Sequence, residues 1–464
     1  GARSLSMYTN RNVGGTIGNA SKNSITGTFN LSLHDTADSE IRLEFEYLLP
    51  GYPGIDSLNS IWIRDRESSN WVKLMEYFVD TVNYTKQHSG SISLTDLFKA
   101  RNWNFTSSVQ VKWEQYDLTL LSTNYYGKGV TLDNIKVYAV KNDIFIAGTD
   151  SIYNYSCSLG NNVPIRLKVG NGVNHTVYNI PVAYQVDNGT VVTGIIDSIP
   201  AKDTIVYAFS APANLDQYRT YILNAWVYLS TDTYRMNDSL LDFRIRNQPV
   251  IAAFPYLQTF EDNDGFFYTG GINSSWQYGS PDKNNIRYAA SGSRAWVTDT
   301  VNTYSNDQHS FLYSPCFDIS SMASPHLSLS LIYDMENIRS EDSSIFDYLY
   351  IEYSNDGNNW HTLGTQGEGY NWYNHSGNVF TGNTNPNWQV ATIPLPRTGD
   401  IFSFRVRFIA DRNTSYSGAA IDDIHIYDLQ QPIYTGDSVR NAIVLSLPSN
   451  TTRAATADGS IIAT

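Results

Sequence analysis

Two carboxylates in this 464-residue sequence stand in strand-like segments where they would face a protein core. In IDDIHIYDL (residues 421–429), apolar and polar residues alternate, so Asp422 points to the same side as Ile424 and Ile426. Asp133 has the matching place in LDNIKVY. An inward carboxylate is costly unless it binds a cation or accepts hydrogen bonds. We therefore expect a cation ligand or an acceptor of backbone N–H groups at these positions.

A second candidate for chemistry is the aromatic loop GEGYNWYNHSGN (367–378). Its Tyr370, Trp372 and Tyr373 stand among asparagines, and such rings and amides can stack on sugars and bind their hydroxyl groups. The loop therefore predicts a ligand-binding surface. The alternative is a structural role in which Trp372 or Tyr373 closes one end of a sandwich.

The other acidic residues and the histidines do not form a catalytic pattern. Glu336, Glu341, Asp342 and Asp347 cluster in polar loops without a spacing that distinguishes an acid from a nucleophile, so we expect them to be solvated. The 8 His lack metal-ligand spacing, and no GxSxG, phosphate-binding or dinucleotide-binding motif occurs. The sequence predicts that the protein is not an enzyme.

Cys157 and Cys316 are the 2 cysteines of the chain, which are too few for a disulfide framework. No cysteine-protease pattern surrounds either residue. We expect them to be separate, buried residues in different domains.

Strand patterns account for most of the elements that must position these residues. Helical patterns are rare, and SLTDLFKA (93–100), with Ser93 or Thr95 as a cap, is the best candidate. Alternation between polar turns predicts strands in LSLSLIYD (327–334), DYLYIEYS (347–354) and FSFRVRFIA (402–410).

The same series of segments occurs twice in the chain. GVTLDNIKVYAV (129–140) matches GAAIDDIHIYDL (418–429), and Trp71 matches Trp360. Because the order of the segments is the same in both series, we infer a duplicated domain. The other matched pairs are 1–9 with 292–300, 40–48 with 326–334, 60–74 with 348–363, and 107–115 with 402–410.

The two ends of the chain add an expectation about its neighbours. Residues 254–291 have no counterpart in the first copy, so we expect that copy to lack its first strands. Either the chain is a fragment of a longer protein, or a strand-donating partner completes the sheet. Residues 431–464 read as a linker and the start of a further module.

The region between the copies has shorter strands with polar turns, as in an immunoglobulin-like sandwich. IRLKVGNG (165–172), the PAKDT turn (200–204) and a final Trp-containing strand resemble CARDB-type modules of bacterial surface proteins. This resemblance implies a spacer or an adhesion unit.

The second copy resembles the MAM-like, concanavalin-type jelly rolls of secreted Bacteroidetes proteins. FEDNDGFF (260–267), SSWQYGSP (274–281) and AIDDIHIYDL (420–429) carry the resemblance. It implies an all-β protein in which two jelly-roll β-sandwiches flank an immunoglobulin-like β-sandwich. The expected domains are 1–142 (a jelly roll lacking its first strands), 143–250 (immunoglobulin-like, CARDB-type), 251–430 (a complete jelly roll) and 431–464 (linker and further module).

The resemblance also implies a structural calcium between the first and last strands of the second jelly roll. Glu261, with Asp262, would then face Asp422, and oxygen ligands from distant strands suit Ca²⁺. The alternative is that Asp422 accepts backbone hydrogen bonds from a neighbouring loop.

Asp followed by Ser or Thr and an aliphatic residue recurs through the chain. The triplet resembles the O-glycosylation acceptor of exported Bacteroidetes proteins, and the alternative explanation is turn formation. The middle residues, which would carry the glycans, are Thr36, Ser57, Thr81, Ser151, Ser198, Thr204, Ser239, Thr300 and Ser438.

Charge and hydropathy restrict the partners. The net charge of -14 with 31 Lys and Arg argues against nucleic acid and anionic membranes, and the sequence predicts no membrane insertion. We expect a non-catalytic extracellular protein of the bacterial cell surface that binds glycans, surface proteins or further modules of the same polypeptide. Two alternatives are a structural subunit of a surface layer or filament, and an accessory region of a secreted protease or glycosidase.

Overall fold

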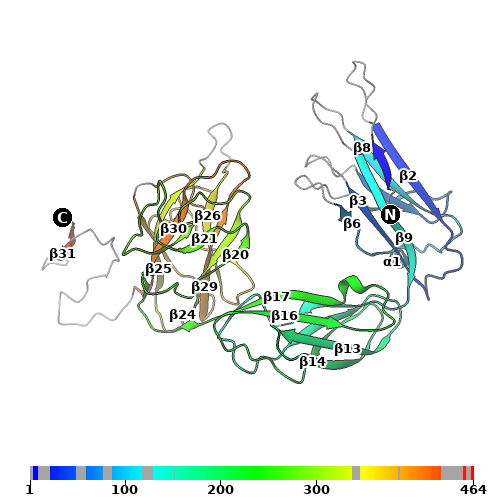
Figure 1. Ribbon diagram of the computed structural model, residues 1–464, viewed down its shortest axis with the longest axis horizontal. Helices are drawn as coiled ribbons and strands as arrows, with labels where there is room; N and C mark the ends of the chain where they lie inside the picture. The colour runs from blue at the N-terminus through cyan, green and yellow to red at the C-terminus, as the bar shows by residue number, and fades with distance from the viewer. Residues whose placement is uncertain are drawn as a thin grey trace, which may run out of the picture. The chain divides into compact units, whose positions relative to one another are not determined.

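A computed structural model gives the fold and describes residues 4–8, 21–48, 59–76, 86–117, 129–150, 152–336, 345–384, 387–429, 453–455 and 461–463. These residues are almost entirely β, which confirms the predicted all-β class (Figure 1). The chain forms two compact units, and their boundary runs through the predicted middle domain. The first unit is Gly1–Asp150, Arg166–Phe209 and Asn224–Leu241; the second is Ser151–Ile165, Ser210–Leu223 and Asp242–Thr464. The predicted domain limits stay a prediction.

The first unit contains a sandwich of two sheets around one core. Alternation along β3 and β8 turns Leu43, Phe45 and Trp113 inward, and the Phe45 and Trp113 rings meet edge to face with centroids 5.8 Å apart. One sheet has the order β1 (Leu5–Tyr8), β9 (Gly129–Val140), β3 (Glu40–Leu48) and β6 (Gln87–His88), with β7 (Ile92–Ser93) also on β3; the other has the order β2 (Ser21–Phe29), β8 (Val109–Asp117), β4 (Ser60–Arg64) and β5 (Val72–Glu76).

The predicted helix is confirmed as α1 (Leu94–Ala100). Ser93 is its N-cap and accepts a hydrogen bond from the backbone N–H of Asp96 at 3.0 Å. Phe98 on the buried face of the helix packs against Phe105, and this contact fixes the helix to the core of the first sandwich.

The region between the sandwiches forms two sheets. One consists of β10 (Ile144–Thr149), β12 (Arg166–Asn171) and β15 (Thr204–Ala208), all in the first unit. Strands β16 and β17 of the other sheet begin in one unit and end in the other. This second sheet has the order β11 (Tyr155–Cys157), β17 (Ser239–Gln248), β16 (Thr220–Val227), β13 (Val177–Val186) and β14 (Val192–Ile199), and the 3-10 helix η2 (Arg235–Asn237) precedes β17.

The second unit contains a larger sandwich with a continuous aromatic and aliphatic core. Its first sheet has the order β21 (Trp276–Gly279), β22 (Ala295–Thr298), β30 (Gly418–Asp428), β25 (Pro325–Asp334) and β28 (Gln389–Pro394), with β19 (Tyr256–Gln258) on β30. Its second sheet joins β20 (Tyr268–Ile272), β23 (His309–Tyr313), β29 (Ile401–Ile409), β26 (Tyr348–Ser354) and β27 (His361–Thr362), with β24 (Cys316–Asp318) on β29 and β18 (Val250–Ile251) on β24.

The two sandwiches repeat one strand order, as the matched segments predict. β1-β9-β3 corresponds to β22-β30-β25, and β2-β8-β4-β5 corresponds to β23-β29-β26-β27. The strand pairs β3–β9 and β25–β30 each contain a register shift. One residue near each shift has a positive φ: Asn134 of β9 at 48° and Asp423 of β30 at 47°. In both copies, the N–H of this residue donates to the preceding aspartate, Asp133 at 2.8 Å or Asp422 at 2.7 Å. Asn and Asp tolerate this backbone conformation, so the local sequence supports the shared irregularity.

The predicted linker and further module at 431–464 lie outside the described residues, except for a hairpin of β31 (Arg453–Ala455) and β32 (Ile461–Ala463).

Candidate functional site

Asp422 lies fully buried on β30, facing the loop that precedes β22. Its Oδ2 accepts the backbone N–H groups of Ala290 at 2.9 Å and Ser291 at 3.1 Å. Burial, together with the charge of Asp423, raises the pKa of Asp422 to about 7. The expected alternatives for Asp422 were a bound cation and backbone N–H donors. The loop supplies such donors.

Glu261, the expected partner of Asp422, is bound to the same loop. Its carboxylate accepts the N–H groups of Ser293 at 2.8 Å and Arg294 at 2.7 Å. Burial acts to raise the pKa of Glu261, but these hydrogen bonds outweigh it and the pKa lies below its ordinary value. Gly292 has φ +57° and leaves space for the carboxylate, because a Cβ there would lie 2.2 Å from Glu261 Cδ.

The structure does not gather Glu261, Asp262 and Asp422 into one group of three ligands. Asp262 is exposed, and burial, with a smaller effect from the Glu261 charge, raises the pKa of Asp423. The calcium role of these residues stays a prediction.

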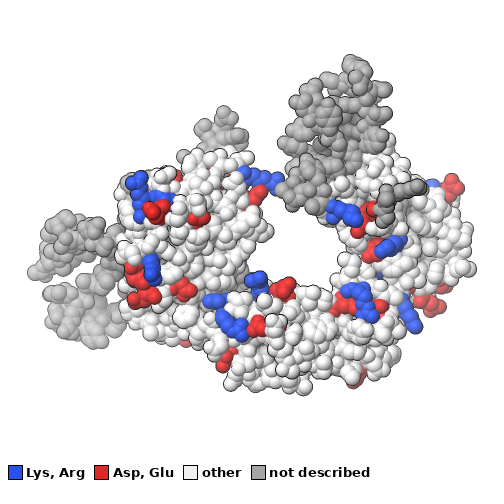
Figure 2. Space-filling view, in the orientation of Figure 1, with Lys and Arg blue, Asp and Glu red and all other residues white. Residues whose placement is uncertain are grey.

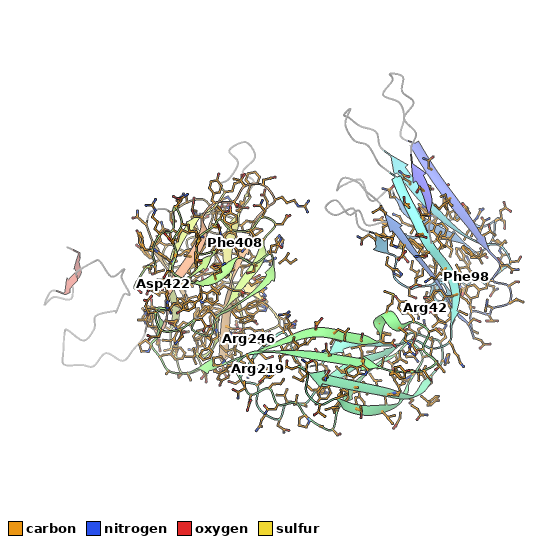
Figure 3. The ribbon with its side chains drawn as sticks, in the orientation of Figure 1. Arg42, Phe98, Arg219, Arg246, Phe408 and Asp422 are labelled. Carbon is orange, nitrogen blue, oxygen red and sulfur yellow. A yellow bond between two sulfur atoms is a disulfide. The ribbon has the colours of Figure 1, made fainter. Side chains whose placement is uncertain are left out.

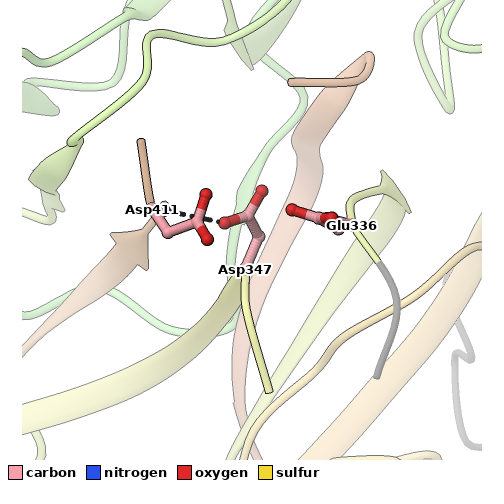
Figure 4. A group of neighbouring side chains, drawn as sticks. All are labelled: Glu336, Asp347 and Asp411. Atoms are coloured by element: carbon pink, nitrogen blue, oxygen red, sulfur yellow. Dashed lines mark hydrogen bonds between the residues drawn. The ribbon is translucent and has the colours of Figure 1, made fainter. Parts of the chain in front are cut away.

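A different acidic group, Glu336, Asp347 and Asp411, could hold a metal ion (Figure 4). Glu336 follows β25, Asp347 precedes β26 and Asp411 follows β29, so three strand ends bring the carboxylates together. One oxygen of each lies within 4.8 Å of the others, which suits a hard cation. Among the described residues, no other group of three acidic, histidine or cysteine side chains is as close.

Asp347 was expected to be a solvated loop residue. The structure shows that this expectation was wrong, because Asp347 has no exposed surface. The Tyr304 hydroxyl donates to its Oδ2, and the Asp411 N–H donates to its Oδ1 at 2.9 Å. Burial raises the pKa of Asp347 above its ordinary value. No local pattern links the three carboxylates, since they lie next to the ends of three different strands.

The aromatic loop is divided between core and surface. Trp372 is 1% exposed and donates from Nε1 to the Leu363 carbonyl at 2.8 Å, and the buried Tyr373 hydroxyl donates to the same carbonyl at 3.0 Å. A packing role therefore replaces the binding role expected for these two rings. Tyr370 is 64% exposed and remains available to a ligand.

The outer face of β4 and β8 carries a group of aromatic and cationic side chains that the sequence patterns did not reveal. Trp62 lies opposite Lys112, whose ammonium is 5.4 Å from the Trp62 ring centroid and 4.7 Å from that of Trp71. The Arg64 guanidinium lies 4.4 Å from the Trp71 centroid. These distances are within the range of cation–π attraction. We call these four residues the first aromatic–cation surface.

The second sandwich has a similar group at corresponding positions. Tyr350 on β26 lies opposite Arg407 on β29, the same register as the Trp–Lys pair of the first surface. Arg407 is 5.4 Å from the Phe311 centroid, and Arg405 lies 4.2 Å from Phe311 and 4.3 Å from Trp360. These five residues form the second aromatic–cation surface. The match of Trp71 with Trp360 in the sequence was a signal from which these two surfaces could have been predicted.

When the paired glutamate beside each surface is counted, two positive charges face one negative charge. Glu352 pairs with Arg405 at 2.6 Å and with Arg407 at 3.5 Å, and Glu114 pairs with Lys112 at 2.8 Å while Arg64 adds a second cation. On the described part of the face in Figure 2, basic and acidic side chains are interspersed and most of the surface is uncharged. The two surfaces are therefore local cationic sites on a chain of net charge -14.

The expected glycan acceptors differ in exposure. Thr204 on β15 and Ser239 on β17 are exposed, and Thr36, Ser198 and Thr300 are half-buried. Turn hydrogen bonds also occur: Asp299 accepts the N–H of Val301 at 2.8 Å. Glycosylation stays a prediction, and Ser57, Thr81, Ser151 and Ser438 lie outside the described residues.

The cysteines do not stay separate as expected. Cys157 and Cys316 form a disulfide across 159 residues, with Cα atoms 6.0 Å apart. Two cysteines gave no pairing pattern in sequence, and only the meeting of β11 with β24 brings them together.

No protein-family model matches the chain, and no curated protein matches it either. A CARDB domain of Pyrococcus furiosus in complex with di-metal ions is 19% identical, covers 23% of this chain and 88% of its own, and has a TM-score of 0.19. The K1 adhesin domain of Lys-gingipain from Porphyromonas gingivalis is 14% identical over 38% of this chain and 99% of its own, with a TM-score of 0.23. PNGase F of Flavobacterium meningosepticum is 10% identical, covers 92% of this chain and 96% of its own, and has a TM-score of 0.17. Similarity at this level assigns no activity to this chain.

Proposed function

We propose that this chain is a non-catalytic adhesion protein of the bacterial cell surface, and that its aromatic–cation surfaces bind acidic glycans. The observation that carries the proposal is the occurrence of such a surface at the same strand positions in both sandwiches. Aromatic faces pack on the C–H groups of sugars, and Lys and Arg pair with sugar carboxylates. Two surfaces on one chain would also strengthen binding to a polymer through avidity.

An extracellular location agrees with the disulfide. A disulfide persists in an oxidising compartment and is rare in a reducing cytosol. No helix among the described residues is both long enough and apolar enough to span a bilayer.

The binding proposal is tested with a galacturonate oligomer as the acidic probe and maltohexaose as the neutral one, by calorimetry. We expect the acidic probe to bind more tightly, with an affinity that falls as salt is added. Lys112→Met and Arg407→Met keep the apolar stems and remove the charges, so each should weaken binding about tenfold, the loss of one charge-assisted hydrogen bond.

Tyr178→Ala is the matched control, since Tyr178 is 62% exposed on β13 and belongs to neither surface. Unchanged affinity in a Lys112→Met, Arg407→Met double variant, or no binding of either probe to the wild type, contradicts the proposal.

We further propose that Glu336, Asp347 and Asp411 hold a structural calcium ion. Thermal unfolding with CaCl2 and with EDTA is the measurement, and a calcium concentration about 100 times Kd should stabilise the second sandwich by about 3 kcal/mol. Asp411→Asn should remove most of this gain, whereas Asp262→Asn should not.

If Asp262→Asn removed the gain and Asp411→Asn did not, the ion would lie at the site expected from sequence, beside Glu261 and Asp422. Equal unfolding temperatures in CaCl2 and EDTA contradict both positions.

A further inference from the structure

Three segments that are distant in sequence meet in the second unit. β11 pairs in parallel with the end of β17, with Cys157 opposite Gln248. Two residues further on, β18 pairs in parallel with β24, with Val250 opposite Cys316. The chain passes from β17 to the second sandwich at Pro249, and the disulfide lies beside this crossing. The backbone at Pro249 joins β17 to β18, and beside it the disulfide joins β11 to β24. Two covalent connections therefore link the pair β11–β17 to the pair β18–β24.

Tyr155 fills the space next to the disulfide. It is 2% exposed, and its hydroxyl donates to the Ser314 carbonyl at 2.9 Å. Its ring stacks on Tyr313 with centroids 5.8 Å apart and meets the edge of Trp360 at 5.6 Å. At Gly357, a Cβ would lie 2.5 Å from the Tyr155 carbonyl oxygen, so the loop after β26 approaches β11 closely.

The end of β17 is held in the same way. The buried Gln248 donates from Nε2 to the Phe266 carbonyl at 2.7 Å. Arg246, which is labelled near the end of β17 in Figure 3, places its guanidinium 4.8 Å from the Tyr268 ring centroid. The disulfide is thus embedded in a packed junction and is not a loose surface link.

We propose that Cys157–Cys316 is a mechanical lock that diverts tension around the middle of the chain. When the two ends are pulled apart, the force that reaches Cys157 passes through the sulfur atoms to Cys316. Residues 158–315 then form a closed loop whose backbone is not stretched between the two ends. This loop contains β12 to β17 and also β18 to β23, so most of the region between the sandwiches is protected.

Strands on either side of the loop remain in the path of the force. β10 precedes Cys157 and can be pulled from β12, and β25 to β30 follow Cys316. The lock stands apart from the proposed adhesion function, because it rests on the disulfide and not on a ligand. It would keep the chain from extending fully under load.

Single-molecule force spectroscopy tests the proposal on the full chain attached at its two ends. An unfolded chain spans about 3.6 Å per residue, so the 159-residue separation should hide about 570 Å of a total of about 1,670 Å. The oxidised chain should therefore reach an extended length of about 1,100 Å when it is unfolded. After a dithiol in the flow cell reduces the disulfide to two thiols and is itself oxidised, the same molecules should release the whole length.

Reduction of the attached wild type while force holds it unfolded is the primary comparison, because the sulfur atoms are then exposed and no variant has to fold. A Cys157→Ser, Cys316→Ser variant should release the full length without a reductant. Tyr155→Phe keeps the ring and the disulfide, and it should lower the unfolding force of the junction without changing the released length. Full extension of the oxidised wild type, or equal lengths before and after reduction, overturns the proposal.

Discussion

At the scale of single residues, Lys283 shows how a buried charge can be part of the fold. Its ammonium donates to the carbonyl oxygens of Thr298 and Ser417, and the side chain is 7% exposed. Burial lowers the pKa of Lys283 to about 7, although the charges of Asp299 and Asp334 oppose this effect. The amine joins the loop after β21 to the start of β30.

Lys283→Met should destabilise the second sandwich by about 3 kcal/mol, because the apolar side chain leaves two buried carbonyl groups without this donor. Denaturant unfolding of the two proteins at neutral pH is the measurement. Arg287→Met, at an exposed position in the same loop, is the control and should change stability little. A Lys283 variant as stable as the wild type would show that the carbonyl groups find other donors.

At the scale of elements, Asp232 holds the start of β10. Its Oδ2 accepts the N–H of Ile144 at 2.6 Å, and its Oδ1 accepts the N–H of Tyr234 at 2.8 Å. Burial, with smaller effects from Asp238 and Asp143, raises the pKa of Asp232 to about 6. The folded state therefore binds this proton more tightly than the unfolded state does.

Because the folded pKa lies above the unfolded value, the contribution of Asp232 to stability is complete below about pH 4 and is lost as the pH rises through about 6. Asp232→Asn has no proton to lose. We expect the difference in unfolding free energy, wild type minus variant, to fall by up to about 3 kcal/mol between pH 4 and 7.

Urea unfolding at several pH values measures this difference. Asp216→Asn, at an exposed position, is the control and should give a difference that does not depend on pH. A pH-independent difference for the Asp232 variant would show that its carboxyl does not titrate between these values.

At the scale of the whole molecule, each sandwich is fastened to part of the region between the sandwiches. In the first unit, the buried Arg42, which is labelled in Figure 3, pairs with Asp143 at 2.6 Å and Glu40 at 3.1 Å. Arg42 also donates to the Gly172 carbonyl at 2.9 Å. In the second unit, the fastening is the disulfide. The first junction depends on charge and hydrogen bonds, and the second adds a covalent bond between sulfur atoms to its packing, so a reductant should weaken only the second.

Patterns of short range were enough to predict the elements. Alternation identified the strands, Ser93 was one of two residues expected to cap α1, and the matching segments 129–140 and 418–429 indicated a duplicated sandwich. Each of these properties depends on residues a few positions apart, because backbone geometry sets the periods of strands and helices. The all-β fold and its repeat were therefore determined by the sequence alone.

The tertiary structure decided which side chains meet. Cys157 joined Cys316, Asp347 was buried beside Glu336 and Asp411, and Trp372 entered the core while Tyr370 stayed outside. These outcomes depend on contacts between strands far apart in sequence, and no local period encodes such a contact. Burial then changed the chemistry of the groups that met, by raising the pKa of Asp347 and by placing two thiols close enough to bond.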